Sequence, residues 1–173
     1  DVMLEHITEI AAASDVPVNA DFLNGFADEP EDLLPNVALC IGTGVAGISI
    51  EDMDANQQLY DTELAVERIR AARKAIDEDG TGVVLVARCE AFLVGHPDAL
   101  HIAVPRLERF AEAGADCLYA PDVTRPEDIA TIVGLRGVEH ILDELIDRLR
   151  DALLTFDPDR VHSPARAGFQ YEE

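Results

Sequence analysis

The chain has 173 residues, of which 13 are Lys or Arg and 35 are Asp or Glu, so its formal net charge is −22. Hydrophobic residues make up 48% of the sequence, which is enough to build a core at this length and excludes an acidic disordered tail. Because so large a negative charge repels DNA, RNA and anionic membranes, we expect neither nucleic acid nor a membrane as a partner.

The basic residues are unevenly chosen, since Lys74 is the single lysine and the rest are arginines. Together with the excess of acids, this composition resembles that of proteins from salt-in halophiles. In molar salt the Debye length falls to about 3 Å, which screens repulsion between surface carboxylates. We therefore expect the stability of the protein to depend on salt.

The three cysteines, Cys40, Cys89 and Cys117, lie in apolar stretches, and their odd number does not fit a disulfide framework. We expect them to be reduced residues of the core. The sequence opens on a helical pattern without the features of a signal peptide, and no apolar run approaches the roughly 20 residues of a membrane span. These features predict a cytoplasmic protein.

Helical and strand patterns alternate along the chain. Helices are predicted over residues 2–13, 30–41, 60–78, 98–113 and 126–133, and strands over residues 18–21, 47–52, 82–88 and 116–120. Pro35 lies beyond the first turn of its helix and predicts a kink. The uninterrupted apolar run at 82–88 predicts a strand buried on both faces. The alternation predicts a parallel α/β sheet, either open and doubly wound or part of a barrel.

The end of the chain departs from this alternation. Residues 138–155 carry an amphipathic helical stripe that follows the preceding helix without a fifth strand between them. Asp157 and Pro158 stop this helix, and the residues beyond have little periodicity. We expect a single α/β domain over residues 1–156 and a loose C-terminal tail over residues 157–173.

Charged residues stand where the predicted strands stop, which is where parallel α/β proteins bind ligands. They are Asp21, Glu51 with Asp52, Arg88 with Glu90, and the stretch from Tyr119 to Asp122. Three consecutive strands thus end in acid, acid and arginine, a combination suited to a divalent metal and a carboxylate or phosphonate. Two structural alternatives stay open: the acids belong to a solvated acidic surface, or Arg88 forms a buried pair with a carboxylate such as Glu51.

Residues 42–47 match the glycine pattern GxGxxG of dinucleotide-binding proteins. That fingerprint must follow a strand and open a helix, whereas here the glycines close a helix and lead into a strand. We therefore expect no nucleotide cofactor, and we expect Gly42 and Gly44 to form a helix C-cap and a turn.

Five segments between residues 3 and 134 resemble, in order, the isocitrate lyase and phosphoenolpyruvate mutase superfamily. They are PVNADFLNGFAD at 17–28, GVAGISIEDMD at 44–54, AVERIRAARKA at 65–75, VARCEAFLVG at 86–95 and FAEAGADCLYAPDV at 110–123. The resemblance implies a partial (β/α)8 barrel of the TIM type, with four parallel βα units corresponding to strands three to six of the family, plus the extra C-terminal amphipathic helix. It also implies Mg²⁺ and a small α-keto acid or hydroxy di-acid that reacts through an enolate-like intermediate.

The resemblance also implies roles for three residues. Asp21 matches the direct magnesium ligand, and Glu51 matches the carboxylate that holds a metal-bound water. Arg88 matches the arginine that binds the carboxylate or phosphonate of the substrate. Hard oxygen ligands suit Mg²⁺, and a guanidinium makes a bidentate clamp for a carboxylate.

The sequence departs from the family at several places. Leu23 stands where the family usually has a second acid, and the KKCGH segment with its acid-base cysteine is absent. The loop at 53–58 lacks the lysine of several lid sequences, and Asp122 stands where many relatives have Gly. The chain shows nothing like the first two or last two strands of the family barrel.

We expect a magnesium-dependent lyase or mutase, with C–C lysis or decarboxylation favoured over P–C chemistry. The alternative is a catalytically inactive truncated paralogue, a half-barrel that folds and associates with itself or with a partner. A four-stranded unit exposes two strand edges, so we expect a homo-oligomer.

Overall fold

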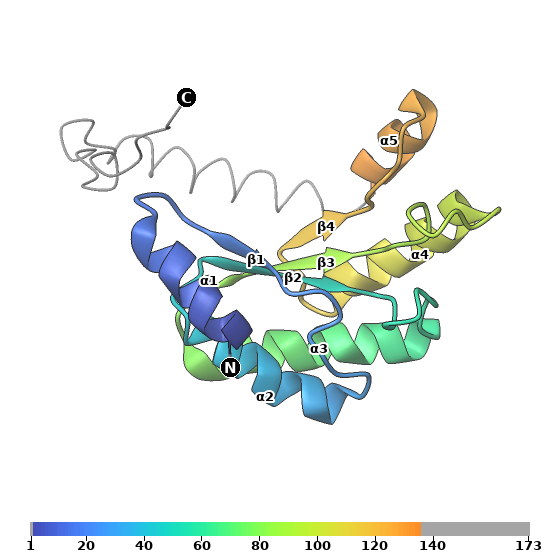
Figure 1. Cartoon of the computed structure of the whole chain (residues 1–173). Coiled ribbons are helices and arrows are strands. Elements are labelled where there is room, and N and C mark those ends of the chain that lie inside the picture. The colour runs from blue at the N-terminus through green and yellow to red at the C-terminus, as the bar shows by residue number, and fades with distance from the viewer. Residues whose placement is uncertain (1, 136–173) are drawn as a thin grey trace.

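The computed structural model of the protein describes residues 2–135, which form four strands and five helices in strict alternation (Figure 1). The elements are α1 (Val2–Ala13), β1 (Asn19–Asp21), α2 (Pro30–Ile41), β2 (Gly47–Glu51), α3 (Thr62–Asp79), β3 (Val84–Arg88), α4 (Ala99–Glu112), β4 (Cys117–Tyr119) and α5 (Pro126–Val133). The predicted helix at 138–155 and the predicted tail at 157–173 lie outside the described residues. Within residues 2–135, every predicted helix and strand is present.

All four strands are parallel and lie in the order β1-β2-β3-β4, so each strand pairs with its neighbour in sequence. Figure 1 shows α2 and α3 beneath the sheet, with α4 beside them below β3 and β4. Successive parallel strands need a crossover connection, and here a helix makes each one. This is the architecture expected of adjacent βα units, and it confirms the predicted α/β class.

The two faces of the sheet differ in burial. Every second side chain of a strand points toward the helices, and those at Ile48, Leu85 and Ala87 have no exposed surface. On the opposite face, Val84 and Val86 of β3 are only half-buried. The prediction that β3 is buried on both faces is therefore wrong for the described residues, because α2, α3 and α4 cover one face of the sheet only.

Local sequence explains the ends of the longest helix. The side chain of Asp61 accepts a hydrogen bond from the backbone N–H of Glu63 at 2.9 Å and caps the start of α3. Gly80 ends the same helix with a φ of 76°, a left-handed conformation that glycine adopts without strain. Pro35 lies inside α2, which runs unbroken through it.

The prediction for the glycine pattern is confirmed. Gly42 is the C-cap of α2 and Gly44 has a φ of 86°, so the pattern closes a helix and leads into β2. The prediction of reduced core cysteines is confirmed for Cys40 and Cys89, which are buried free thiols, but Cys117 is a free thiol that is only half-buried and lies outside the core. None of the helices within residues 2–135 is both long and apolar enough to span a membrane.

Candidate active site at the carboxyl ends of the strands

The strands end on the residues that the sequence singles out. Asp21, Glu51, Arg88 and Tyr119 are the last residues of β1, β2, β3 and β4. The register places Glu51 beside Arg88 and Arg88 beside Tyr119, while Asp21 pairs with Ser49, two residues before Glu51. Because side chains alternate along a strand, all four strand-end side chains belong to the face that the helices leave uncovered.

Arg88 is the centre of this cluster, with its side chain only 11% exposed. Its Nε–H donates to Oε1 of Glu90 at 2.7 Å, and its Nη1 donates to Oδ2 of Asp21 at 2.8 Å. Its Nη2 lies 3.2 Å from Oε1 of Glu51, and its guanidinium carbon lies 5.6 Å from the centre of the Tyr119 ring. The structure thus brings Asp21, Glu51 and Arg88 together, and it also contains the predicted buried pair of Arg88 with a carboxylate.

Three carboxylates share this one guanidinium, and the pKa values of Glu90, Glu51 and Arg88 itself are shifted. Burial raises the pKa of Glu90 to about 7, against the lowering effect of Arg88 and with a further rise from Glu51 and Asp52. Burial also raises the pKa of Glu51, again against Arg88. Burial acts to lower the pKa of Arg88, but Glu90, Asp21 and Glu51 together raise it. When all of these groups are ionised, the cluster carries more negative than positive charge.

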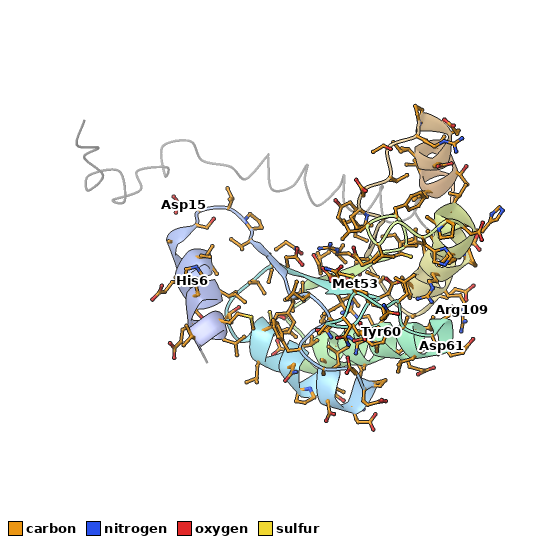
Figure 2. The ribbon with its side chains drawn as sticks, turned by 45° about the vertical axis from the view of Figure 1, so that its right-hand side comes forward. His6, Asp15, Met53, Tyr60, Asp61 and Arg109 are labelled. Carbon is orange, nitrogen blue, oxygen red and sulfur yellow. The ribbon has the colours of Figure 1, made fainter. Side chains whose placement is uncertain are left out.

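A cleft of about 260 Å³ opens beside Glu51, between the loop after β1 and the loop after β2. Its lining residues are Leu23, Asn24, Phe26, Glu51, Met53, Asp54, Ala55 and Gln57. Figure 2 labels Met53 near the start and Tyr60 near the end of the loop that follows β2. His6, which lies on α1, is on the other side of the molecule from this loop. The cleft and the Arg88 cluster share Glu51, so a small ligand in the cleft lies next to the charged cluster.

A second ion pair supports the cluster from inside the protein. Asp52 is 2% exposed, and its Oδ2 accepts a hydrogen bond from Nη1 of Arg106, on α4, at 3.1 Å. Its Oδ1 accepts a hydrogen bond from the backbone N–H of Glu90 at 2.7 Å. Arg106 also donates from Nη2 to the backbone carbonyl of Tyr60 at 2.5 Å. Asp52 therefore connects the end of β2 to the loop after β3, and both of its carboxylate oxygens bind partners inside the protein, unlike the neighbouring Glu51, which contacts Arg88.

The loop after β1 is held against the same site. Leu23, which stands where the resemblance implies a second acid, has a φ of 51° and is 47% exposed. Its backbone carbonyl accepts a hydrogen bond from the N–H of Glu51 at 2.9 Å. A left-handed backbone is costly for leucine, so the surrounding contacts must hold this loop in place. At this position the chain offers a backbone carbonyl to Glu51 and an apolar side chain to the cleft.

The donor set fits a magnesium ion. Within residues 2–135, no group of three or more His, Cys, Asp or Glu side chains is arranged to hold a metal. However, proteins usually bind Mg²⁺ through one or two carboxylates and leave several waters on the ion. Asp21, whose side chain is 60% exposed, and Glu51 are the two carboxylates that would hold such an ion, and both contact Arg88 in this structure. The excess of negative charge around Arg88 also favours a divalent cation.

The fold and this site are those of a barrel-derived α/β protein with an acid and arginine cluster at its strand ends. The sequence pattern of the phosphoenolpyruvate phosphomutase family matches residues 1–141, and the chain belongs to that family. This confirms the superfamily that the five segments indicate.

Individual relatives agree with this assignment. An uncharacterised protein of Mycobacterium tuberculosis is 32% identical over 116 residues, which are 66% of this chain and 42% of the relative. The 2-methylisocitrate lyase of Escherichia coli is 31% identical over 133 residues, which are 72% of this chain and 43% of the relative. The chain thus spans less than half the length of these curated relatives.

Solved structures show the same fold. A provisionally named lyase/mutase of Burkholderia cenocepacia has a TM-score of 0.74 at 40% identity, covering 80% of this chain and 50% of that one. A phosphonopyruvate hydrolase in complex with oxalate and Mg²⁺ has a TM-score of 0.66 at 29% identity, covering 79% of this chain and 48% of that one. This chain covers about half of each of these larger proteins, which agrees with a unit of four adjacent βα repeats.

Sequence reasoning missed the partners that surround the predicted residues. It named Glu90 and Asp52 only as neighbours of strand-end residues and assigned them no role, although Asp52 anchors the Glu90 backbone and Glu90 binds Arg88. It assigned nothing to Arg106. The available signal was the position of Glu90, two residues after Arg88 and so on the same side of an extended chain.

Proposed function

We propose that this chain contains a magnesium and carboxylate-binding site of a cytoplasmic enzyme that acts on a small α-keto acid or hydroxy di-acid. The reaction class is C–C lysis or decarboxylation through an enolate. The observation that carries the proposal is the convergence of Asp21, Glu51 and Arg88 at three neighbouring strand ends. The names of two relatives, 2-methylisocitrate lyase and a phosphonopyruvate hydrolase complexed with oxalate and Mg²⁺, support this substrate class.

Each residue has a distinct part in the proposal. Asp21 holds the ion directly and Glu51 holds it through water, while Arg88 binds the carboxylate of the substrate. A guanidinium has five N–H donors, and hydrogen bonds to Glu90 and Asp21 occupy two of them. The remaining donors lie on the terminal nitrogens, of which Nη2 also lies 3.2 Å from Oε1 of Glu51, and a substrate carboxylate that replaces this contact would bind there in the bidentate manner. When bound, Mg²⁺ supplies positive charge that stabilises an enolate oxygen.

The test is a thermal melt in molar KCl with and without Mg²⁺ and oxalate, a planar mimic of an enolpyruvate-type intermediate. A ligand present at 100 times its Kd stabilises the folded state by about 2.7 kcal/mol. For a chain of this size that corresponds to a rise in Tm of about 5–10 °C. We expect this rise only when Mg²⁺ and oxalate are both present.

Two variants with the same change in charge test whether the ligand-induced rise in Tm depends on Asp21. Asp21→Asn removes the proposed metal ligand and should abolish the rise in Tm. Asp15→Asn makes the same change of charge at an exposed residue outside the cluster and should leave the rise intact. Equal ligand-induced shifts in the two variants would refute the assignment of Asp21.

Two observations favour the second candidate, a folded member of the family that associates without catalysis. Leu23 places an apolar side chain where the family usually has an acid, and β1 and β4 each have one edge without a paired strand within the described residues. Unpaired strand edges favour association, here as a homo-oligomer. A cooperative melt that is indifferent to Mg²⁺ and oxalate would favour this candidate, whereas a single monomer peak in light scattering at high salt would contradict self-association.

A further inference from the structure

Glu90 is a buried carboxylate next to the proposed site that the proposed function leaves without a role. Its side chain has no exposed surface. Oε1 accepts the hydrogen bond from Nε–H of Arg88, whereas Oε2 is buried without a hydrogen-bond partner among residues 2–135. Leaving a buried carboxylate oxygen unpaired is costly, so a purely structural role does not explain why an acid occupies this position.

The backbone of Glu90 is fixed on both sides. Its N–H donates to Oδ1 of Asp52 at 2.7 Å, and its carbonyl accepts from the N–H of Val94 at 2.9 Å. Asp52 is itself held by the buried Arg106. The carboxylate of Glu90 therefore starts from a rigid position, and it can impose its own orientation on the arginine that binds it.

The bond from Nε determines how the guanidinium of Arg88 lies. A guanidinium is planar, so an acceptor on Nε fixes both the plane and the direction of the terminal nitrogens. Here the Nε edge faces Glu90, and the terminal nitrogens face Asp21 and Glu51 at the open side of the sheet. An arginine without this bond could rotate about its side-chain torsions and turn the bidentate edge away.

We propose that Glu90 is a positioning residue that aims the terminal nitrogens of Arg88 at the substrate carboxylate. The proposal rests on the proposed function, because it concerns the same anion-binding arginine. Glu90 acts through its hydrogen-bond acceptor rather than through its charge. A buried negative charge beside an anion site weakens anion binding, so the acceptor is the useful feature and the charge opposes it.

Two variants separate the acceptor from the charge. Glu90→Gln keeps a side-chain oxygen at the same distance from the backbone and removes the charge. Glu90→Leu has a similar volume and removes both. If Glu90 only neutralises Arg88, the two variants should behave alike, whereas a positioning role predicts that glutamine rescues what leucine loses.

The first readout is the ¹⁵N–¹H NMR signal of the Arg88 Nε–H, identified by its loss in Arg88→Lys. We expect slow exchange of this proton with solvent in the wild type and in Glu90→Gln, and fast exchange or loss of the signal in Glu90→Leu. Slow exchange in Glu90→Leu, or fast exchange in Glu90→Gln, would overturn the proposal. If the melt shows that Glu90→Leu does not fold, the exchange rate measured in Glu90→Gln decides alone whether the acceptor at residue 90 is sufficient.

The second readout is the affinity for oxalate in the presence of Mg²⁺, measured by calorimetry. Loss of a hydrogen bond to a charged group corresponds to a fall in affinity of about tenfold or more in Glu90→Leu. Glu90→Gln should bind at least as tightly as the wild type, and a tenfold fall in that variant would contradict the proposal. A wild type that does not bind oxalate overturns the proposed function and with it the substrate carboxylate as the target of Arg88. The exchange of the Nε–H is measured without ligand, so it tests the hydrogen bond from Arg88 to Glu90 separately.

Discussion

Replacing Arg68 with methionine should release the loop between β1 and α2. Arg68 lies on α3 and is 1% exposed. Its Nη1 donates to the backbone carbonyls of Ala27 and Asp28, each at 2.5 Å, and its Nη2 donates to the carbonyl of Asn24. The Tyr60 ring lies 4.3 Å from its guanidinium carbon. One side chain thus satisfies three carbonyls of the loop that carries the residues after Asp21.

The expected loss follows from these contacts. Hydrogen bonds to a charged group contribute about 1.5–3 kcal/mol each, but part of this gain offsets the cost of burying the guanidinium. A carbonyl left without its donor costs about 1–3 kcal/mol when it stays buried, so with three carbonyls affected we expect Arg68→Met to lower the free energy of unfolding by about 3–5 kcal/mol. This is a large fraction of the roughly 5–15 kcal/mol that stabilises a typical domain.

The assay is equilibrium unfolding in urea at fixed molar KCl, with Arg70→Met as the matched control. Arg70 lies on the same helix, but its side chain is 50% exposed and pairs with the nearby, similarly exposed Glu67. Exposed pairs contribute about 0–1 kcal/mol, so the control should remain close to the wild type. If Arg68→Met lost no more stability than Arg70→Met, the three carbonyl contacts would not hold the loop as argued.

Two further predictions concern the buried acids. Arg106→Met leaves Asp52 buried without its cation and should lower the free energy of unfolding in urea by about 3 kcal/mol or more. Adding Asp52→Asn to this variant should restore part of the lost stability, whereas additive losses in the double variant would contradict the coupling. Because burial raises the folded-state pKa of Glu90 from 4.5 to about 7, its contribution to stability is fully present below pH 4.5 and is lost as the pH rises through 7. This contribution reaches at most about 3 kcal/mol, and Glu90→Gln should flatten the fall in stability between pH 5 and 8; an unchanged slope in that variant would show that Glu90 does not titrate in this range.

Several features of this protein follow from local sequence. The strand ends at Asp21 and Arg88, and the end of β2 to within one residue, were predictable because strand-forming runs stop there at charged residues. The glycine pattern at 42–47 could also be interpreted from neighbouring residues, because it follows a helix and precedes a strand, the reverse of the order in a dinucleotide-binding fold. Asp122 has a φ of 64°, and aspartate is among the few residues that adopt this left-handed conformation in place of glycine.

Other features required the tertiary structure. Arg88 and Asp21 are 67 positions apart, and nothing in either segment says that they share a hydrogen bond. The burial of Glu90, the carbonyls bound by Arg68 and the half-buried outer face of β3 depend on which elements pack against them. The periodicity of the sequence specifies which residues lie on the same face of a strand or a helix, whereas burial and charge pairing depend on neighbours from distant segments. Local sequence therefore determined where the charged residues of the site would stand, and only the packing of the sheet decided which of them lose water and share one guanidinium.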